Sequence, residues 1–388
     1  MLASQKHLFS LPDDVHYLNC AYMAPLSRRV EAAGIAGIQY KRNPTTIEPA
    51  SFFEESDTAR RLFAELIHAE AQRIALIPAA SYGIATAAAN IHVRRGHNLV
   101  VVHEQFPSNV YTWKRLAAQT GAELRTVAPP DGTNRGARWN ERILDAINAD
   151  TAVVSLGHVH WADGTRFDLA RIGERARDVD ACFVVDATQS VGALPFDVRQ
   201  IRPDALICAG YKWLLGPYSI GVAYFGPRFD HGVPLEENWI TRLHSENFGG
   251  LVQYQDAYHA GAIRYDVGER SNFILVPMLV TALKHLHEWG IANIQAYCAE
   301  LTGGLLHEAR RLGFVLEDET WRSAHLFGVR VPPHLPMNRL KKALAERNVA
   351  VSMRGDAIRI SPNVYNDTSD MEALHDAFLS CMEPSPRL

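Results

Sequence analysis

One lysine stands at a position where lysine is unusual. Lys212 follows an apolar run, Ala205–Ala209, that predicts a buried strand, and it lies between Tyr211 and Trp213. Gly216-Pro217 predicts a turn that closes this segment. A lysine held where a strand leaves the core loses hydration, which lowers its pKa because the charged ammonium is disfavoured. The unprotonated amine is a nucleophile that can form a Schiff base with an aldehyde.

A carboxylate ends a second apolar run upstream. Cys182–Asp186 predicts another buried strand. If the two runs are parallel strands of one sheet, Asp186 and Lys212 lie at the same carboxyl-terminal edge, where open α/β sheets bind ligands. Pyridoxal phosphate (PLP) chemistry needs this pair, because the lysine holds the aldehyde and the aspartate keeps the pyridine nitrogen protonated. The two residues therefore predict PLP as the cofactor.

Small residues follow the first strand that we expect in the sheet. Ala79–Gly83 opens a predicted helix, and a helix N-terminus offers free N–H groups and a positive dipole end to a phosphate. The Ser81 hydroxyl can add to such a site, or Ser81 can simply cap the helix. Together with Asp186 and Lys212, the segment favours phosphate binding. The chain has no P-loop and no GxGxxG motif, which disfavours nucleotide sites of those types.

Aromatic residues and histidines follow two further strands. Phe106 could stack on a pyridine ring, although a phenylalanine at such a place can also belong to the core. His158 and His160 alternate at a strand end, so they are expected to share a face. This spacing suits metal ligands, but we expect no metal here. We expect His160 or Trp161 to line a substrate pocket instead.

An arginine alternates with apolar residues in a predicted strand, Ala357–Ser361. Arg359 needs a partner there, and a substrate carboxylate is suitable because a guanidinium binds it bidentately. An internal salt bridge is the alternative, and the sequence leaves both open. Asn19, in the short apolar stretch Tyr17–Pro25, is a further candidate for the substrate side.

Composition excludes several classes of protein. The 388 residues carry 39 basic and 43 acidic side chains, a formal charge of −4, so we expect no broad surface for nucleic acid or anionic lipid. The five cysteines are scattered without a CxxC pair, which favours reduced thiols and a cytoplasmic location. We see no signal-peptide core and no apolar run near 18 residues, so we expect neither secretion nor a membrane span.

Strands and helices alternate along most of the chain. Helical segments are expected between most of the strands, which predicts an α/β fold with a seven-stranded, mainly parallel sheet covered on both faces. The expected strands are Arg73–Pro78, Asn98–His103, Glu123–Ala128, Ala152–His158, Cys182–Asp186, Ala205–Ala209 and Ile220–Phe225.

We expect three parts in the chain: an arm over residues 1–20, a large domain over residues 21–273 and a smaller α+β domain over residues 274–388. Residues 226–273 lack periodicity and are expected to be functional or to form an interface. The last part reads as strands and helices, including one strand over Val349–Ser352, a turn at Arg354-Gly355-Asp356 and a final helix. That helix is expected to begin with a capping box of Ser369 and Glu372.

Three stretches together resemble the class V aminotransferase family of fold-type I PLP enzymes. The family also includes cysteine desulfurases, kynureninases, an isopenicillin epimerase and ergothioneine C–S lyases. The matching stretches are Val184-Val-Asp-Ala-Thr-Gln-Ser-Val-Gly192, Gly210-Tyr-Lys-Trp-Leu-Leu-Gly-Pro217 and Ile358-Arg-Ile-Ser-Pro-Asn-Val-Tyr-Asn366.

The resemblance implies a role for each matched residue. Lys212 would hold the cofactor and move the proton at the substrate's α-carbon, and Arg359 would hold the substrate carboxylate. The other cofactor contacts would come from Asp186 at the pyridine nitrogen, Gln189 at the ring hydroxyl, Phe106 over the ring, and Ser81, the Tyr82 backbone and Tyr211 at the phosphate. The family is typically homodimeric, and the loop Gly268–Asn272, with Ser271 and Asn272, would complete the partner subunit's phosphate site.

The expected reaction is transamination of an amino acid. A C–S or C–C lyase and an epimerase of the same family are the alternatives, because all of them begin at the same carbon. A cysteine desulfurase is not expected, since residues Val349 to Arg359 contain no cysteine for the loop that desulfurases need. A non-catalytic relative that keeps the fold, and a nucleotide-binding α/β enzyme, are more remote alternatives. The substrate is left open.

Overall fold

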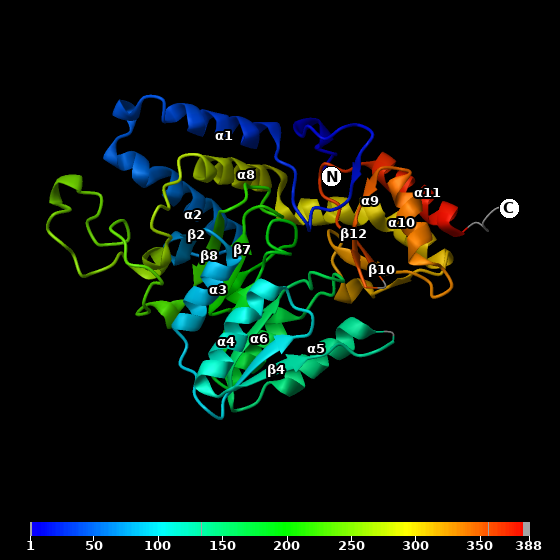
Figure 1. Ribbon diagram of the computed structural model, residues 1–388, viewed down its shortest axis with the longest axis horizontal. Coiled ribbons are helices and arrows are strands. Elements are labelled where there is room, and N and C mark those ends of the chain that lie inside the picture. The colour runs from blue at the N-terminus through cyan, green and yellow to red at the C-terminus, as the bar shows by residue number, and fades with distance from the viewer. Residues whose placement is uncertain (1, 133, 356, 383–388) are drawn as a thin grey trace.

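The seven apolar runs form one central sheet. The structure is a computed structural model that describes residues 2–132, 134–355 and 357–382 (Figure 1). The spatial order is β2-β8-β7-β6-β5-β3-β4, and β8 alone runs antiparallel to its neighbours. Each predicted strand is confirmed to within one residue at either end. The strands are β2 (Ile74–Ile77), β3 (Asn98–Val102), β4 (Glu123–Val127), β5 (Thr151–Gly157), β6 (Cys182–Asp186), β7 (Ala205–Ala209) and β8 (Gly221–Phe225).

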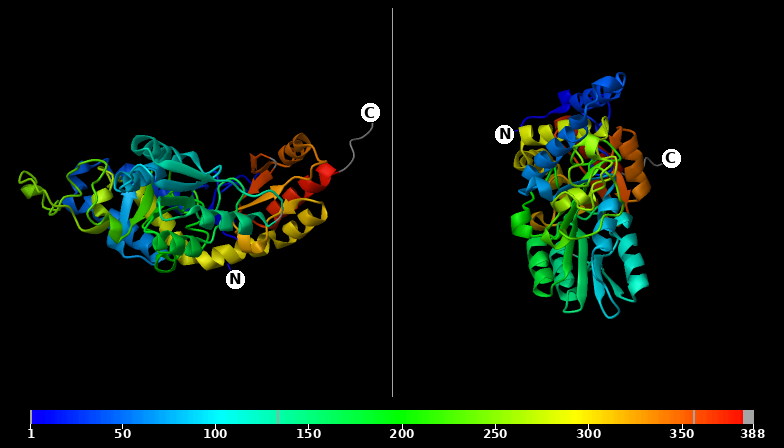
Figure 2. Two further views of the ribbon diagram at one scale, coloured as in Figure 1. Left: turned by 90° about the horizontal axis from the view of Figure 1, so that it is seen from below. Right: turned by 90° about the vertical axis from the view of Figure 1, so that its left-hand side faces the viewer.

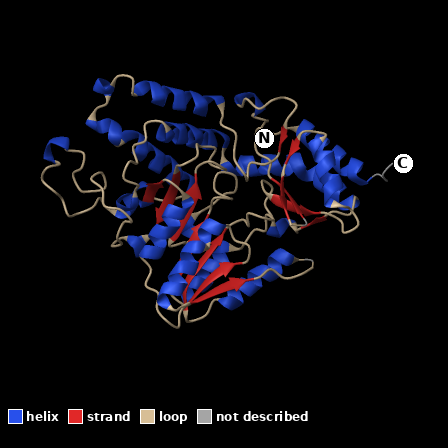
Figure 3. Ribbon diagram, viewed as in Figure 1, coloured by secondary structure: helices blue, strands red, loops and turns tan. Residues whose placement is uncertain are grey.

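Successive side chains of the strands enter two different cores, because a strand alternates its faces. Val185 of β6 and Leu206 of β7 belong to the larger core, whereas Val184 and Ile207 belong to the other. These strands are therefore apolar on both faces, as expected for a parallel sheet that helices cover on both sides (Figure 3).

Helices cover both faces of the sheet. On one face lie α3 (Ala80–Ala89) and α4 (Tyr111–Thr120). The other face packs against α2 (Glu54–Ile67), α5 (Arg135–Ala146), α6 (Leu169–Asp178), α7 (Val198–Ile201) and α8 (Leu275–Trp289). Outside this layer, α1 (Arg28–Tyr40) runs along α8 (Figure 1).

The C-terminal part has a core of its own. Its antiparallel sheet has the order β12-β13-β10-β9. Apolar side chains of this sheet pack against the helices of the same part, for example Phe327 and Phe378. The elements are α9 (Ile291–Arg311), β9 (Val315–Leu316), β10 (Phe327–Arg330), α10 (Met337–Ala345), β11 (Val349–Ala350), β12 (Ser352–Arg354), β13 (Ala357–Ile360) and α11 (Thr368–Met382).

The N-terminal segment is tied to the C-terminal part. β1 (His16–Tyr17) pairs in parallel with β11, and Asn19 bridges Ser361. The single strand expected over Val349–Ser352 was therefore wrong, because its first half pairs with β1 and its second half belongs to β12. Arg354, expected in a turn, ends β12, and Asp356 of that turn lies outside the described residues.

The expected capping box of α11 was placed two residues too late. The Ser369 backbone N–H donates to the Asp367 carboxylate at 3.0 Å, and the Asp367 N–H donates to the Asp370 carboxylate at 2.9 Å. Asp370 thus makes the bond expected of Glu372, and the Asp367 carboxylate caps the N–H two residues on, not three. The motif spacing was right, but a second acceptor pair two residues earlier fits the helix start.

The segment between β8 and α8 projects from the body at the end opposite the C-terminal helices (Figures 1 and 2). Its base is anchored by Asp266, whose buried carboxylate pairs with Arg60 of α2 and with Arg270. Short 3-10 helices lie here and elsewhere: η1 (Lys6–Leu8), η2 (Pro44–Thr46), η3 (Pro49–Phe52), η4 (Ala71–Arg73), η5 (Pro107–Asn109), η6 (Pro227–Phe229), η7 (Phe248–Gly250), η8 (Gly261–Tyr265) and η9 (Glu319–Trp321).

Within the described residues, no helix is both long enough and apolar enough to cross a bilayer. The division of the chain after residues 20 and 273 stays a prediction.

Candidate active site

Two neighbouring strand ends bring the predicted lysine and aspartate together. β6 and β7 run in parallel with Asp186 opposite Ile207, so both strands end at the same edge of the sheet. A cavity of about 270 Å³ opens at this edge. Eight of the predicted residues line it: Ser81, Phe106, His160, Trp161, Asp186, Gln189, Tyr211 and Lys212.

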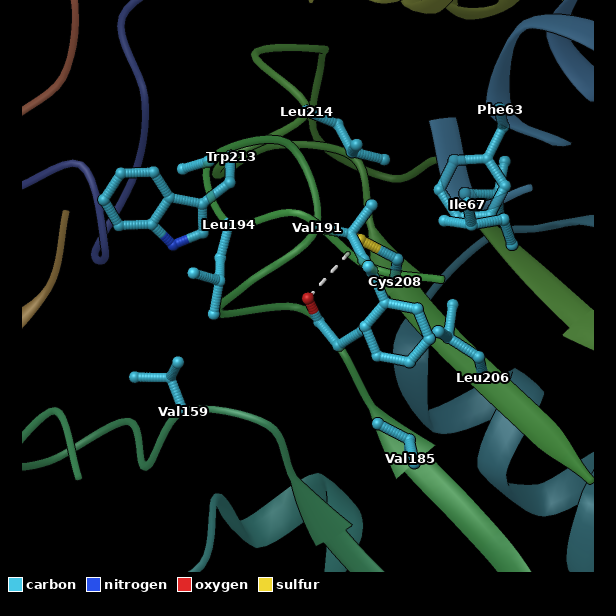
Figure 4. Packing of buried hydrophobic residues seen from close by; sticks show 14 of the residues in the cluster. Phe63, Ile67, Val159, Val185, Val191, Leu194, Leu206, Cys208, Trp213 and Leu214 are labelled. Carbon is cyan, nitrogen blue, oxygen red and sulfur yellow. Dashed lines mark hydrogen bonds between the residues drawn. The ribbon is translucent and has the colours of Figure 1, made fainter. Parts of the chain in front are cut away.

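Close backbone packing holds the lysine segment against the loop after β6. Gly192 has a φ of +104°, and a Cβ at this position would lie 2.1 Å from the Trp213 carbonyl oxygen. The Trp213 indole donates to the Gln189 side chain at 2.9 Å. Figure 4 shows Val191, Leu194, Trp213 and Leu214 within one buried cluster. Lys212 is therefore placed by the packing of Trp213 and Leu214, which follow it in the chain.

Burial makes the Lys212 amine easy to deprotonate. The side chain is 5% exposed, and no hydrogen bond joins its Nζ to any described residue. Burial lowers the pKa of Lys212 to about 8, although the charge of Asp186 opposes this shift. The Nζ atom lies 5.2 Å from the centroid of the Phe106 ring and 5.5 Å from that of Tyr211. With a pKa of about 8, roughly one tenth of this amine is uncharged at pH 7.

Asp186 is a carboxylate with spare acceptor capacity. Burial raises its pKa, while hydrogen bonding to Thr188 and the charge of Lys212 lower it. The Thr188 backbone N–H donates to Oδ1 at 3.1 Å. A carboxylate in this position gains most from a cationic donor that enters the cavity.

Aromatic rings form one wall of the cavity. Phe106 packs edge-on against Trp161, with ring centroids 5.4 Å apart at 84°. The Trp161 indole donates to the Glu104 carbonyl oxygen at 2.6 Å, which fixes its orientation. On the other side, the Tyr211 ring lies 4.6 Å from that of Tyr218, which is exposed and also lines the cavity.

The start of α3 faces the cavity. Ala79 and Ser81 both belong to its lining. The N-cap residue of α3 is Ala79 and not Ser81, so the alternative that Ser81 caps the helix was wrong. Tyr82 does not line the cavity, and its backbone N–H donates to the Ala79 carbonyl oxygen at 3.0 Å. The free N–H groups of the first turn therefore come from residues before Tyr82.

Two amide side chains line the cavity deeper in the fold. Gln189 donates from Nε2 to the Ala21 carbonyl oxygen at 3.1 Å and accepts from Trp213, which leaves one N–H of Nε2 for a ligand. Asn109 is fully buried, and its Nδ2 has no hydrogen-bond partner among the described residues. Asn109 was not predicted, although it lies only three residues after Phe106.

Arg359 lies next to Asn19, outside the lining of the cavity, and contacts Trp161, which belongs to that lining. The guanidinium donates to the Trp161 carbonyl oxygen at 2.7 Å, to Ser352 Oγ at 3.2 Å and to Asn19 Oδ1 at 3.5 Å. None of these acceptors is charged. Burial, followed by the charge of Arg354, lowers the pKa of Arg359 to about 10. Within the described residues the alternative of an internal salt bridge was wrong.

The two histidines do not share a face as expected. His160 lines the cavity, but its Nδ1 lies 3.0 Å from an Asp163 carboxylate oxygen and its Nε2 lies 3.2 Å from the His103 carbonyl oxygen. His158 lines a different cavity and packs against Phe196. The chain turns after β5, so the strand alternation assumed for the pair ends at Gly157.

Ser271 and Asn272 lie away from this cavity. Ser271 donates its hydroxyl to the Phe52 carbonyl oxygen. Asn272 Oδ1 accepts the N–H groups of Ile274 at 3.0 Å and Leu275 at 2.9 Å, at the start of α8. Within one subunit, both residues therefore have local partners.

The family of this chain can now be stated. Residues 48–374 match the family described as Aminotransferase class-V. The chain belongs to the class V aminotransferase family. This match confirms the resemblance that the sequence motifs indicated. The chain is a PLP-dependent enzyme.

Relatives in this family have different activities. YcbU of Bacillus subtilis (strain 168), an uncharacterized aminotransferase, is 25% identical over 82% of this chain and 81% of its own length. The isopenicillin N epimerase of Streptomyces clavuligerus is 25% identical over 82% of each chain. A probable cysteine desulfurase of Methanothermobacter thermautotrophicus is 35% identical, but over 43% of this chain and 40% of its own.

Solved structures confirm the fold. The apo cysteine desulfurase from Thermococcus onnurineus NA1 has a TM-score of 0.79 at 19% identity and covers 97% of both chains. The cystine C–S lyase C-DES, in complex with its product cysteine persulfide, has a TM-score of 0.82 at 18% identity over 96% of this chain and 99% of its own. The predicted fold-type I architecture is therefore confirmed.

The residues at the cavity suit PLP. Lys212 offers an amine with a lowered pKa for the cofactor aldehyde, and the partly buried Asp186 is an acceptor for a protonated pyridine nitrogen. The Asn109 amide nitrogen supplies a buried donor that lacks a partner among the described residues. Each of these three groups has hydrogen-bonding capacity that the described residues do not use, and a flat, polar heterocycle would use it.

Proposed function

We propose that the protein is an aminotransferase that acts at the α-carbon of an amino acid. The observation that carries the proposal is that Lys212 and Asp186 face one cavity, while the buried Arg359 beside it has no carboxylate partner among the described residues. Bound PLP supplies an electron sink for the negative charge that develops at the α-carbon. The protein's own residues bind the substrate, orient it and move its protons.

Lys212 has two tasks in this proposal. Its uncharged amine would hold the cofactor aldehyde, and the same amine would accept the proton from the substrate's α-carbon. A lowered pKa suits both tasks, because a base with a pKa near the working pH is uncharged often enough to accept a proton and acidic enough to return it.

Asp186 and the aromatic wall position the cofactor. The Asp186 carboxylate would hold the pyridine nitrogen in its protonated form, and Phe106 would lie over the ring. Gln189 and Asn109 would donate to the polar substituents of the ring, and Ser81 with the start of α3 would bind the phosphate. Tyr211, which also lines the cavity, would be close to the phosphate.

Arg359 would bind the substrate's α-carboxylate. Its guanidinium has three neutral acceptors and a buried Nε without a described partner, so a carboxylate would supply the opposite charge and the bidentate acceptor that it lacks. Asn19 and Ser352 would hold the guanidinium in place. His160 would shape the pocket wall next to Trp161 without using its ring nitrogens on the substrate.

Buried thiols disfavour a desulfurase. All five cysteines are free and buried, and none lines the cavity. Burial raises the pKa of Cys20 to about 11, so a thiolate nucleophile is not available there. The free thiols also support a location in the reducing cytoplasm, which we propose.

A homodimer completes the proposal. The apolar residues Ile35 and Ile38 of α1 are exposed, as is Tyr22 at 60%. Apolar surface of this kind on one side of a subunit is typical of an oligomer interface. Ser271 and Asn272 would then reach the phosphate site of the partner subunit.

A panel of amino acids tests the function. The purified protein with PLP is incubated with each amino acid, with and without a keto-acid acceptor. Formation of the matching keto acid only with the acceptor supports transamination. Ammonia with pyruvate would instead identify a lyase, and inversion of the amino acid an epimerase. Either result would replace the proposed reaction.

A further inference from the structure

A second arginine, Arg354, lies beside Arg359 and is not used by the function proposed above. Arg354 is the last residue of β12, which pairs antiparallel with β13 so that Ser352 lies opposite Arg359. Side chains two residues apart on a strand point to the same face. Arg354, Ser352 and Arg359 therefore share one face of the β12–β13 hairpin.

Both guanidinium groups reach the same tryptophan. Arg359 donates to the Trp161 carbonyl oxygen, and the Arg354 guanidinium carbon lies 5.0 Å from the centroid of the Trp161 ring. Trp161 lines the cavity that contains Lys212 and packs edge-on against Phe106. One aromatic side chain thus connects the two arginines with the reaction cavity.

Neither arginine has a carboxylate partner among the described residues. Arg354 donates from Nη1 to the carbonyl oxygen of Met353 at 2.7 Å, and its Nε is buried without a partner. The charge of Arg354 adds to burial in lowering the pKa of Arg359. Two guanidinium groups this close repel each other, and an anion bound between or beside them would relieve both the repulsion and the unmet hydrogen bonds.

We propose that Arg354 binds a second anionic group of the substrate, so that the enzyme acts on amino acids with a side-chain carboxylate, such as aspartate or glutamate. The inference rests on the proposed function, in which Arg359 takes the α-carboxylate. A guanidinium stacked on an indole ring keeps its N–H edge free for bidentate binding of a carboxylate. The corresponding amides, asparagine and glutamine, would leave this edge unpaired, so the site discriminates against them.

Steady-state kinetics test the assignment in the PLP-bound enzyme. The wild type is expected to prefer each acidic amino acid over its amide. In Arg354→Met the KM for the acidic amino acid should rise roughly 10- to 100-fold, while kcat changes little and the KM for the amide stays the same. The KM of Arg354→Lys for the acidic amino acid should lie between the values of the wild type and Arg354→Met, because a lysine keeps the charge but not the planar fork. Arg310→Met, which removes an exposed arginine of α9, is the matched control and should behave as the wild type.

Calorimetry separates this inference from the proposed reaction. Succinate and glutarate have no amine, so their binding does not depend on turnover, and each is compared with its monoamide. Tighter binding of the dicarboxylates, lost in Arg354→Met, supports the anion site even if no amino acid reacts, in which case the proposed function alone fails. Equal binding of dicarboxylate and monoamide, or an equal loss of both in Arg354→Met, overturns the inference. Turnover of neutral amino acids at equal or higher kcat/KM also overturns it and leaves the proposed function standing.

Discussion

Gly192 and Trp213 approach each other so closely that a Cβ on residue 192 would lie 2.1 Å from the Trp213 carbonyl oxygen. The contact joins the loop that follows Asp186 to the segment that carries Lys212. Residue 192 must be glycine for two reasons. There is no space for a Cβ, and the φ of +104° is unfavourable for any other residue. The segments that carry Asp186 and Lys212 are therefore held together by a backbone contact rather than by flexible side chains.

Gly192→Ala should damage both stability and the site. We expect a loss of roughly 3 kcal/mol or more in the free energy of unfolding, from backbone strain and from the displaced Trp213 carbonyl, together with weaker PLP binding. Denaturant unfolding and cofactor titration measure the two effects. Gly303→Ala is the control, since nothing lies within 4 Å of a Cβ there and the helix position favours alanine by about 0.5–1 kcal/mol. Equal stability of the two variants would contradict this account.

Lys212→Met should abolish covalent attachment of PLP while the fold is kept. Borohydride reduction followed by peptide mass spectrometry should find the cofactor on Lys212 in the wild type and on no residue in the variant. Because burial lowers the pKa of Lys212 to about 8, attachment in the wild type should become faster as pH rises through 8. Cofactor found on another lysine would show that the site is assigned wrongly.

The same lysine makes the stability of the cofactor-free protein depend on pH. The folded pKa of about 8 is below the ordinary value of 10.5, so the unfolded chain binds more protons between these pH values and stability rises with pH in this window. Below pH 8 the wild type carries a buried ammonium, and Lys212→Met should be more stable by up to about 3 kcal/mol. The difference should disappear toward pH 10.5. Chemical denaturation of both proteins from pH 7 to 10 measures it.

Acid should weaken the fold through His325. Its Nε2 donates to the Gln189 carbonyl oxygen at 2.9 Å, and its Nδ1 lies 3.0 Å from the Gln295 side-chain nitrogen, so the neutral ring fits this site. Burial lowers the pKa of His325 to about 4, although the bond to Gln189 opposes the shift. The unfolded chain therefore binds more protons between pH 6.5 and 4, and stability falls as pH decreases through this range. In His325→Gln the Tm should depend less on pH than in the wild type or in His92→Gln, an exposed control.

Arg359→Met should separate activity from stability. The variant loses the proposed carboxylate ligand, so KM should rise by roughly 100-fold or more. Since the guanidinium is buried without an acidic partner among the described residues, its removal should leave the unfolding free energy unchanged or higher. Kinetics and denaturant unfolding on the same preparation give both values. A large loss of stability would indicate that Arg359 holds the fold and not a substrate.

Subunit mixing tests the predicted contribution of Ser271 to the partner's site. Lys212→Met inactivates the subunit's own site, and Ser271→Asp should place a negative charge at the phosphate of the neighbour. If two subunits share their sites, a mixture of the two variants regains about one quarter of the wild-type activity, because half of the dimers are mixed and each has one intact site. No recovery in a mixture that forms mixed dimers would show that Ser271 serves another purpose.

Local sequence patterns were enough to predict the sheet and the residues at its edge. Short, mainly apolar runs identified most of the strands, because burial on both faces leaves no room for polar alternation. The edge strand β4 (Glu123–Val127) is the exception, since it carries polar side chains. Parallel strands end at one edge, so Asp186 and Lys212 could be placed together before any contact was known. The family motifs added Gln189 and Tyr211 to this set.

Tertiary structure decided which partners those residues have. Whether Arg359 meets a carboxylate, whether His158 joins His160, and where Arg354 points all depend on segments far apart in the chain, and no local periodicity encodes such contacts. Arg354 reads as a turn residue in the sequence, but pairing of β12 with β13 turns its side chain toward Trp161. The sequence by itself thus determined the chemistry of the cofactor site, whereas the electrostatic surroundings of the substrate arose only when the C-terminal hairpin packed against the end of β5.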